Sequence, residues 1–89
     1  MRAYRVEFVP KAYEELASLD KTVAQRVLRK LRWLAENLDN LTPEPLIGEF
    51  KGLFKLRIGS YRVVFSCDRE KRVIIVHLIG HRSDIYKSA

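Results

Sequence analysis

Four basic side chains lie in a short stretch near the middle of the chain, and no acidic residue stands among them. They are Lys51, Lys55, Arg57 and Arg62. A solvated segment normally mixes charges of both signs, so a stretch of one sign calls for a different explanation. Phosphate oxygens suit arginine because its planar guanidinium donates two parallel hydrogen bonds. The pattern therefore predicts a phosphate site, and it favours RNA or DNA over an acidic metabolite.

A two-residue turn determines which of these side chains face one another. Alternating apolar and basic residues stand on either side of Gly59 and Ser60. A Gly-Ser connection suits a type II′ hairpin turn, because glycine supplies the positive φ that the first turn position requires. This register places Arg57 directly opposite Arg62. Lys55 lies two residues before Arg57 and points to the same face.

These three cations are expected to form one cluster on a single face of the hairpin. The opposite face carries the apolar set Phe54, Leu56, Ile58, Tyr61 and Val63. Like charges that face each other destabilise a sheet, so their presence favours an anion-binding role. The alternative is an edge hairpin that its charges keep soluble, as in many edge strands.

The remaining reactive side chains indicate little other chemistry. His81, Arg82 and Tyr86 follow the last predicted strand and reach an RNA only if this tail folds over the cationic face. His77 lies within that strand and is assigned no role. Cys67 is the single cysteine, so no internal disulfide forms, and no histidine or cysteine pair has zinc-ligand spacing. No carboxylate pair suits acid–base work, so we expect chemistry without a metal or another cofactor.

Composition and length limit the class of protein. The chain has 89 residues, which is enough for one domain, residues 1–89, and 47% of them are hydrophobic, which excludes disorder over the whole length. The formal net charge is +6, of which +1 falls in residues 1–45 and +5 in residues 46–89. No signal-peptide pattern and no membrane-spanning stretch is present, so we expect a cytoplasmic protein with no membrane partner.

The periodicity predicts the elements that position the cations. A strand is expected over residues 2–9, a helix over 11–18, and a longer helix from an N-cap at Asp20 to about Asn37. Residues 39–48 are expected to form a loop. A three-stranded antiparallel meander follows, with strands over 54–58, 61–66 and 72–79. The predicted fold class is α+β, with a helical hairpin packed on one face of a small, mainly antiparallel sheet.

Two segments of the sequence resemble a known family. They are residues 50–65, FKGLFKLRIGSYRVVF, and residues 79–86, IGHRSDIY. Together with the opening strand and the helical hairpin they resemble the RelE toxins of the RelE/ParE superfamily. The resemblance implies a toxin of a type II toxin–antitoxin system that enters the ribosomal A site and cuts mRNA there. In that family the 2′-hydroxyl of the RNA attacks the adjacent phosphate, without a metal, and translation is inhibited.

The resemblance also implies roles for individual residues. Lys55 and Arg62 match positions that bind the scissile phosphate and stabilise its developing charge. Arg82 matches the position of a general acid, and Tyr86 matches one that stacks on a base. Arg57 stands where the family pattern has a lysine that serves as general base.

The arginine at position 57 changes the expected chemistry. A lysine among cations has a lowered pKa and can accept a proton, whereas an arginine stays charged because its pKa lies far above physiological pH. We therefore expect Arg57 to stabilise charge, with Lys55 or a group of the RNA or ribosome accepting the proton and His81 as a secondary proton carrier. The residues expected to bind RNA are Lys51, Lys55, Arg57, Arg62 and Tyr86.

Partners follow from the same resemblance. The expected ones are the ribosome, its mRNA and a cognate RelB-like antitoxin that is helical and acidic. Two other functions stay open at the level of the sequence: a ParE-like inhibitor of DNA gyrase, and a RelE-fold binding protein without catalytic activity.

Overall fold

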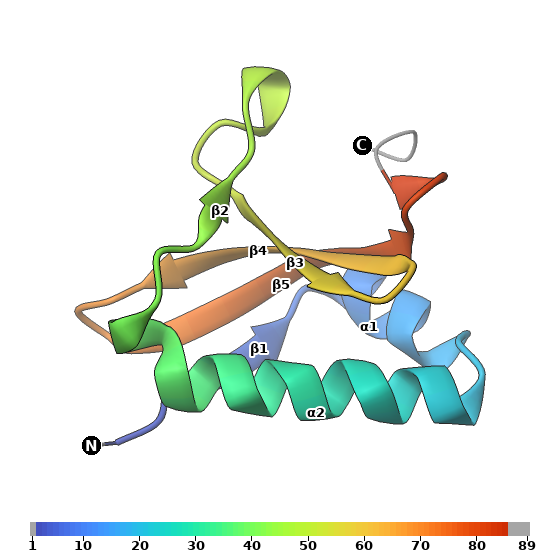
Figure 1. Cartoon of the computed structure of the whole chain (residues 1–89), viewed down its shortest axis with the longest axis horizontal. Coiled ribbons are helices and arrows are strands. Elements are labelled where there is room, and N and C mark those ends of the chain that lie inside the picture. The colour runs from blue at the N-terminus through green and yellow to red at the C-terminus, as the bar shows by residue number, and fades with distance from the viewer. Residues whose placement is uncertain (1, 86–89) are drawn as a thin grey trace.

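Two helices pack on one face of a five-stranded sheet in the computed structural model, which describes residues 2–85 (Figure 1). The helices are α1 (Pro10–Ala17) and α2 (Lys21–Asn37), followed by the short 3-10 turn η1 (Leu38–Asn40). The strands are β1 (Arg5–Phe8), β2 (Glu44–Pro45), β3 (Phe54–Ile58), β4 (Tyr61–Asp68) and β5 (Val73–His81), and the 3-10 turn η2 (Gly48–Phe50) precedes β3. The predicted α+β class is confirmed.

The sheet has the order β1-β5-β4-β3-β2. Strands β3, β4 and β5 form the predicted antiparallel meander, and β1 pairs with β5 in parallel. The prediction of a plain loop over residues 39–48 is wrong, because β2 lies within it and pairs with β3. The strand that was expected to end at residue 79 continues to His81.

The two helices follow from the sequence pattern. Pro10 is the first residue of α1, where its missing N–H costs no hydrogen bond. Asp20 precedes α2 as predicted, although its side chain accepts no capping hydrogen bond. The buried side of α2 presents Val27, Leu31 and Leu34 at helical spacing. Within residues 2–85 no helix is both long and apolar enough to cross a membrane.

Apolar side chains cover both faces of the central strands. The main core lies between the helices and the sheet and includes Val63 and Phe65 of β4. A second, smaller cluster lies on the other face, where Val64 and Leu78 pack against Ile85 and the loop before β3. The predicted alternation along β4 is therefore incomplete, because Val64 is fully buried on the face that carries the cations.

A bulge interrupts the pairing of β4 with β5. Val64 pairs with Leu78, whereas the next residue, Phe65, pairs with Val76. His77 is the extra residue, and its Nε2 lies 2.8 Å from the Oγ of Ser66. Burial lowers the pKa of His77, because partial removal from water disfavours the charged imidazolium.

Candidate nucleic-acid interface

The hairpin formed by β3 and β4 has the predicted register. Arg57 pairs with Arg62. Gly59 has a φ of +58°, and Ser60 is absent from the positive-φ positions, as a type II′ turn requires. The two guanidinium groups therefore leave neighbouring strands on the same face. The predicted opposition of Arg57 and Arg62 is confirmed by the pairing.

Arg62 is held in place by the turn that precedes it. Its Nη1 donates hydrogen bonds to the carbonyl oxygens of Gly59, at 2.9 Å, and Tyr61, at 2.8 Å. These bonds use one nitrogen of the guanidinium and leave its other nitrogens as donors toward a ligand. On β5 the residue opposite Arg62 is Gly80, which has no side chain to cover it. Ile85 instead lies over Gly80 on this face, and Arg62 is half-buried.

Lys55 has an acidic partner that the sequence analysis missed. Glu44 of β2 stands opposite Lys55, and its Oε2 lies 3.1 Å from the lysine Nζ. The carboxylate lies within ion-pair distance and holds the half-buried Lys55 side chain beside β2. One sequence signal points to this strand: Thr42 and Glu44 each precede a proline, and such residues favour extended backbone.

Arg82 lies at the turn of the same hairpin. Its backbone N–H donates to the carbonyl oxygen of Ser60 at 2.8 Å, which extends the pairing of β4 with β5 beyond His81. Its side chain is exposed. The structure therefore brings together Arg57, Arg62 and Arg82 around one turn, although residue 82 lies 20 positions after residue 62 in the chain.

The other predicted site residues lie apart from this group or outside residues 2–85, which the structure describes. His81 pairs with Tyr61, and the two rings meet edge-on with their centres 5.6 Å apart. The Nδ1 of His81 lies 2.8 Å from the Oγ of Ser83. By strand alternation this places His81 on the face opposite Arg62. Lys51 is exposed after η2, at the far end of the connection to β3. Tyr86 lies outside the described residues.

The arrangement of cations is suited to binding an anion and stabilising its negative charge. The arginines attract a phosphate and stabilise negative charge that develops on it. Among residues 2–85 no three histidine, cysteine or acidic side chains lie together as metal ligands would. The cationic hairpin, by which we mean Lys55, Arg57, Arg62 and Arg82, is the strongest candidate site in the described part of the chain.

Comparison with known proteins defines the class. Residues 6–86 match the profile of the family described as ParE toxin of type II toxin-antitoxin system, parDE. Toxin RelG of Mycobacterium tuberculosis is 36% identical over 78 residues, which cover 74% of this chain and 90% of that protein. The mRNA interferase toxin RelE of Escherichia coli K12 is 30% identical over 94 residues, covering 98% of this chain and 94% of the toxin.

Solved structures agree with the sequence matches. A chain in the toxin–antitoxin complex RelBE2 from Mycobacterium tuberculosis superposes with a TM-score of 0.82 at 27% identity, covering 94% of this chain and 97% of that one. The isolated E. coli RelE toxin gives a TM-score of 0.74 at 27% identity, covering 89% and 84%. The protein is thus a toxin of a type II toxin–antitoxin system. It belongs to the RelE/ParE superfamily, as a RelE-type member.

Proposed function

We propose that this toxin cuts mRNA on the ribosome without a metal and so inhibits translation in the cytoplasm. The observation that carries the proposal is the hairpin register that sets Arg57 opposite Arg62, with Arg82 bonded to the same turn through Ser60. A relative that is 30% identical over nearly the whole chain is named an mRNA interferase, which supports the choice of RNA.

In the proposed reaction the 2′-oxygen of one nucleotide forms a bond to the adjacent phosphorus, and the bond from phosphorus to the 5′-oxygen breaks. The products are a 2′,3′-cyclic phosphate and a 5′-hydroxyl. Arg57 and Arg62 stabilise the extra negative charge on the pentacoordinate phosphorus, and Arg82 donates hydrogen bonds to the departing 5′-oxygen. The 2′-hydroxyl proton goes to a basic group of the RNA or ribosome, because Lys55 is ion-paired with Glu44. The departing 5′-oxygen takes up a proton from water to become the 5′-hydroxyl, so the net reaction moves one proton from the 2′-oxygen to the 5′-oxygen.

The test is cleavage of a defined mRNA on programmed ribosomes, with the RNA ends mapped chemically. We expect rapid cleavage on ribosomes, slow cleavage of free RNA, an unchanged rate in EDTA and no cleavage where the attacking nucleotide is 2′-deoxy. Arg62→Gln is expected to lower the rate about 10²- to 10³-fold, as loss of one preorganised charge donor does elsewhere. Lys71→Gln, which removes one exposed cation at the β4–β5 turn, is the matched control.

Other outcomes would replace the proposal. If free and ribosome-bound mRNA are cleaved at equal rates, the proposed dependence on the ribosome is wrong. Continued cleavage at a 2′-deoxy nucleotide refutes the proposed attack by the 2′-hydroxyl. Inhibition of gyrase supercoiling without RNA cleavage assigns the chain to the gyrase-directed class. Arg62→Gln or Arg82→Gln with undiminished growth arrest indicates a binding protein.

We also propose a cognate antitoxin of acidic, helical character. The superposing M. tuberculosis chain was crystallised as a toxin–antitoxin complex, and a chain with a formal net charge of +6 favours an acidic partner. Co-expression with the neighbouring small gene followed by co-purification checks this. Recovery of the toxin alone at low salt would refute it.

A further inference from the structure

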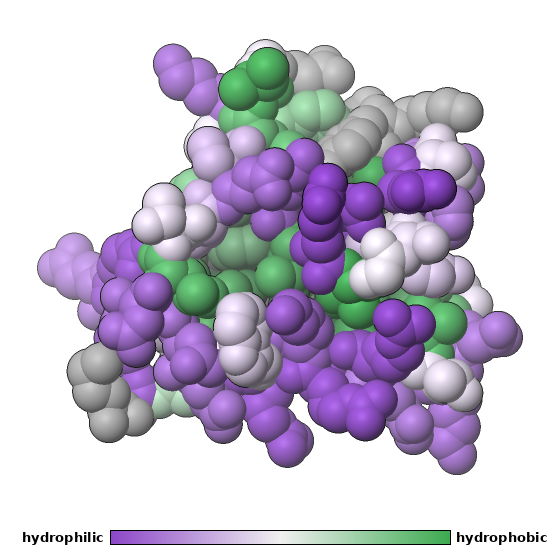
Figure 2. Space-filling model, in the orientation of Figure 1, coloured by the Kyte–Doolittle hydropathy of each residue, from purple (hydrophilic) through white to green (hydrophobic). Residues whose placement is uncertain are grey.

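Basic side chains recur along the exposed side of helix α2, where Leu28 and Trp33 are exposed as well. Between Asp20 and Glu36 the chain has five basic residues and no acidic one: Lys21, Arg26, Arg29, Lys30 and Arg32. In Figure 2 hydrophilic side chains cover the outer side of this helix along the lower part of the view. Like charges three or four residues apart destabilise a helix by about 0.2–0.5 kcal/mol a pair, so an isolated solvated helix gains nothing from this pattern.

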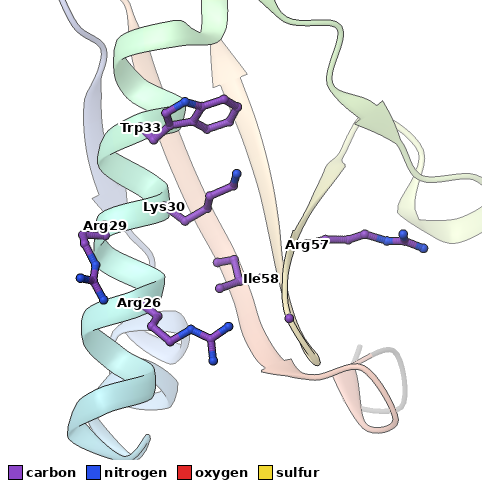
Figure 3. A pocket seen from close by; sticks show the side chains of 7 residues that line it. Arg26, Arg29, Lys30, Trp33, Arg57 and Ile58 are labelled. Carbon is purple, nitrogen blue, oxygen red and sulfur yellow. The ribbon is translucent and has the colours of Figure 1, made fainter.

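A groove of about 480 Å³ separates α2 from the edge of β3. Arg26, Lys30 and Trp33 project from the helix toward that edge (Figure 3). The edge is open there because β2 pairs only with the first two residues of β3 and leaves the stretch from Arg57 to the turn uncovered. The backbone of Arg57 lines the groove, whereas its side chain points away to the other face (Figure 3). One strand therefore separates the groove from the cationic hairpin.

Two cations of the groove are positioned by neighbours that are not acids. The Nζ of Lys30 lies 3.9 Å from the centre of the Trp33 ring. The guanidinium of Arg26 covers Gly59, and a Cβ added to that glycine would lie 2.8 Å from its Nη2. None of the ion pairs found within residues 2–85 involves a cation of α2. These charges are held in place, and no carboxylate neutralises them.

We propose that this α2 groove, defined by Arg26, Lys30 and Trp33 with the open edge of β3, binds the phosphate backbone of double-stranded RNA. A rigid helix with cations one turn apart fits a regular row of phosphates. Lys30 covers one face of Trp33, the single aromatic ring of the groove, so the groove offers no series of rings on which successive unpaired bases could stack. A protein partner would need more apolar anchors than this groove offers.

The choice of RNA over DNA rests on the proposed function, whereas the phosphate chemistry does not. A toxin with two cationic surfaces, one on each side of β3, can hold a structured RNA with α2 while the cationic hairpin faces another strand. The α2 groove thus serves as a docking surface separate from the reacting phosphate.

The test measures binding of a fully paired RNA hairpin of about 16 base pairs by fluorescence anisotropy at several salt concentrations. The full chain is compared with Arg26→Gln/Lys30→Gln. We expect binding to weaken by about tenfold for each lost cation, and the slope of log affinity against log salt to fall by about two. The control Arg5→Gln/Lys71→Gln removes the same charge elsewhere and is expected to keep the parent slope.

Thermal unfolding checks that both variants fold, and Arg26→Lys/Lys30→Arg, which keeps both charges, is expected to restore binding. Equal loss in the control overturns the proposal, because net charge alone then explains binding. Unchanged duplex binding with lost affinity for an acidic antitoxin segment assigns the groove to a protein and also overturns it. Tighter binding of duplex DNA overturns the choice of RNA. The assay contains no ribosome and measures no mRNA cleavage. Failure of the proposed groove and failure of the proposed function can therefore be told apart.

Discussion

Replacing Arg57 with glutamine is expected to make the toxin more stable and less active at once. Arg57 stands directly opposite Arg62, and like charges in that position destabilise a sheet by about 0.2–1 kcal/mol. Two charges about 6 Å apart in water repel by about 0.7 kcal/mol, in the same range. For a domain of this size such a gain raises the melting temperature by about 3–6 °C.

The assay is thermal unfolding at low salt and at 1 M salt, paired with cleavage on programmed ribosomes. At 1 M salt the screening length falls to about 3 Å, so the gain in stability should vanish. Cleavage should fall about 10²- to 10³-fold, because one of the charges that stabilise the reacting phosphate is lost. Lys71→Gln removes the same charge from the exposed turn at the other end of β4, away from the cationic hairpin, and it should leave cleavage unchanged.

Three results would refute this reasoning. A gain that persists at 1 M salt means that repulsion between Arg57 and Arg62 is not its cause. Full activity together with increased stability means that the hairpin charges serve only solubility, the alternative that the sequence left open. A loss of both stability and activity would show that the Arg57 side chain packs in the fold and that the pair does not repel.

Three further substitutions check other parts of the structure. Phe65→Ala should lower the free energy of unfolding by about 3–5 kcal/mol in urea titrations, because Phe65 is fully buried and packs against the ring of Phe54. Hydrogen bonding from Tyr4, aided by nearby arginines, lowers the pKa of Asp39. The stability that this carboxylate contributes above about pH 4 should therefore decline as the pH falls through the lowered pKa. Asp39→Asn should remove this decline in acid unfolding curves. Glu44→Gln should strengthen RNA binding and steepen its salt dependence, since it removes the carboxylate beside Lys55.

The hairpin could be predicted from the sequence because local signals fix it. A two-residue turn containing glycine and alternating apolar residues on both sides allow only one register, and the structure has that register. The opposition of Arg57 and Arg62 follows from these signals alone. The approach of Arg82 depends on the length of β5, which runs past the predicted end.

The parts that could not be predicted depend on contacts between distant segments. The partnership of Glu44 with Lys55 requires a strand of two residues, which is too short to show any period. The burial of Val64 depends on the loop before β3 folding over the sheet. The α2 groove was missed for a different reason: the one-signed stretch is visible in the sequence, but only the fold shows that Arg26 and Lys30 face an open strand edge.

The exposure of the cations gives a physical reason for dependence on the ribosome. Arg57 and Arg82 are exposed, and a charge pair at 4 Å contributes only about 1 kcal/mol in water. The same pair contributes about 4 kcal/mol where the surroundings resemble a protein surface with little water. On the proposed function, a large partner covers these exposed arginines and excludes water from them. On the proposed function, the ribosome raises the cleavage rate both by holding the mRNA and by strengthening the charges that this toxin already presents.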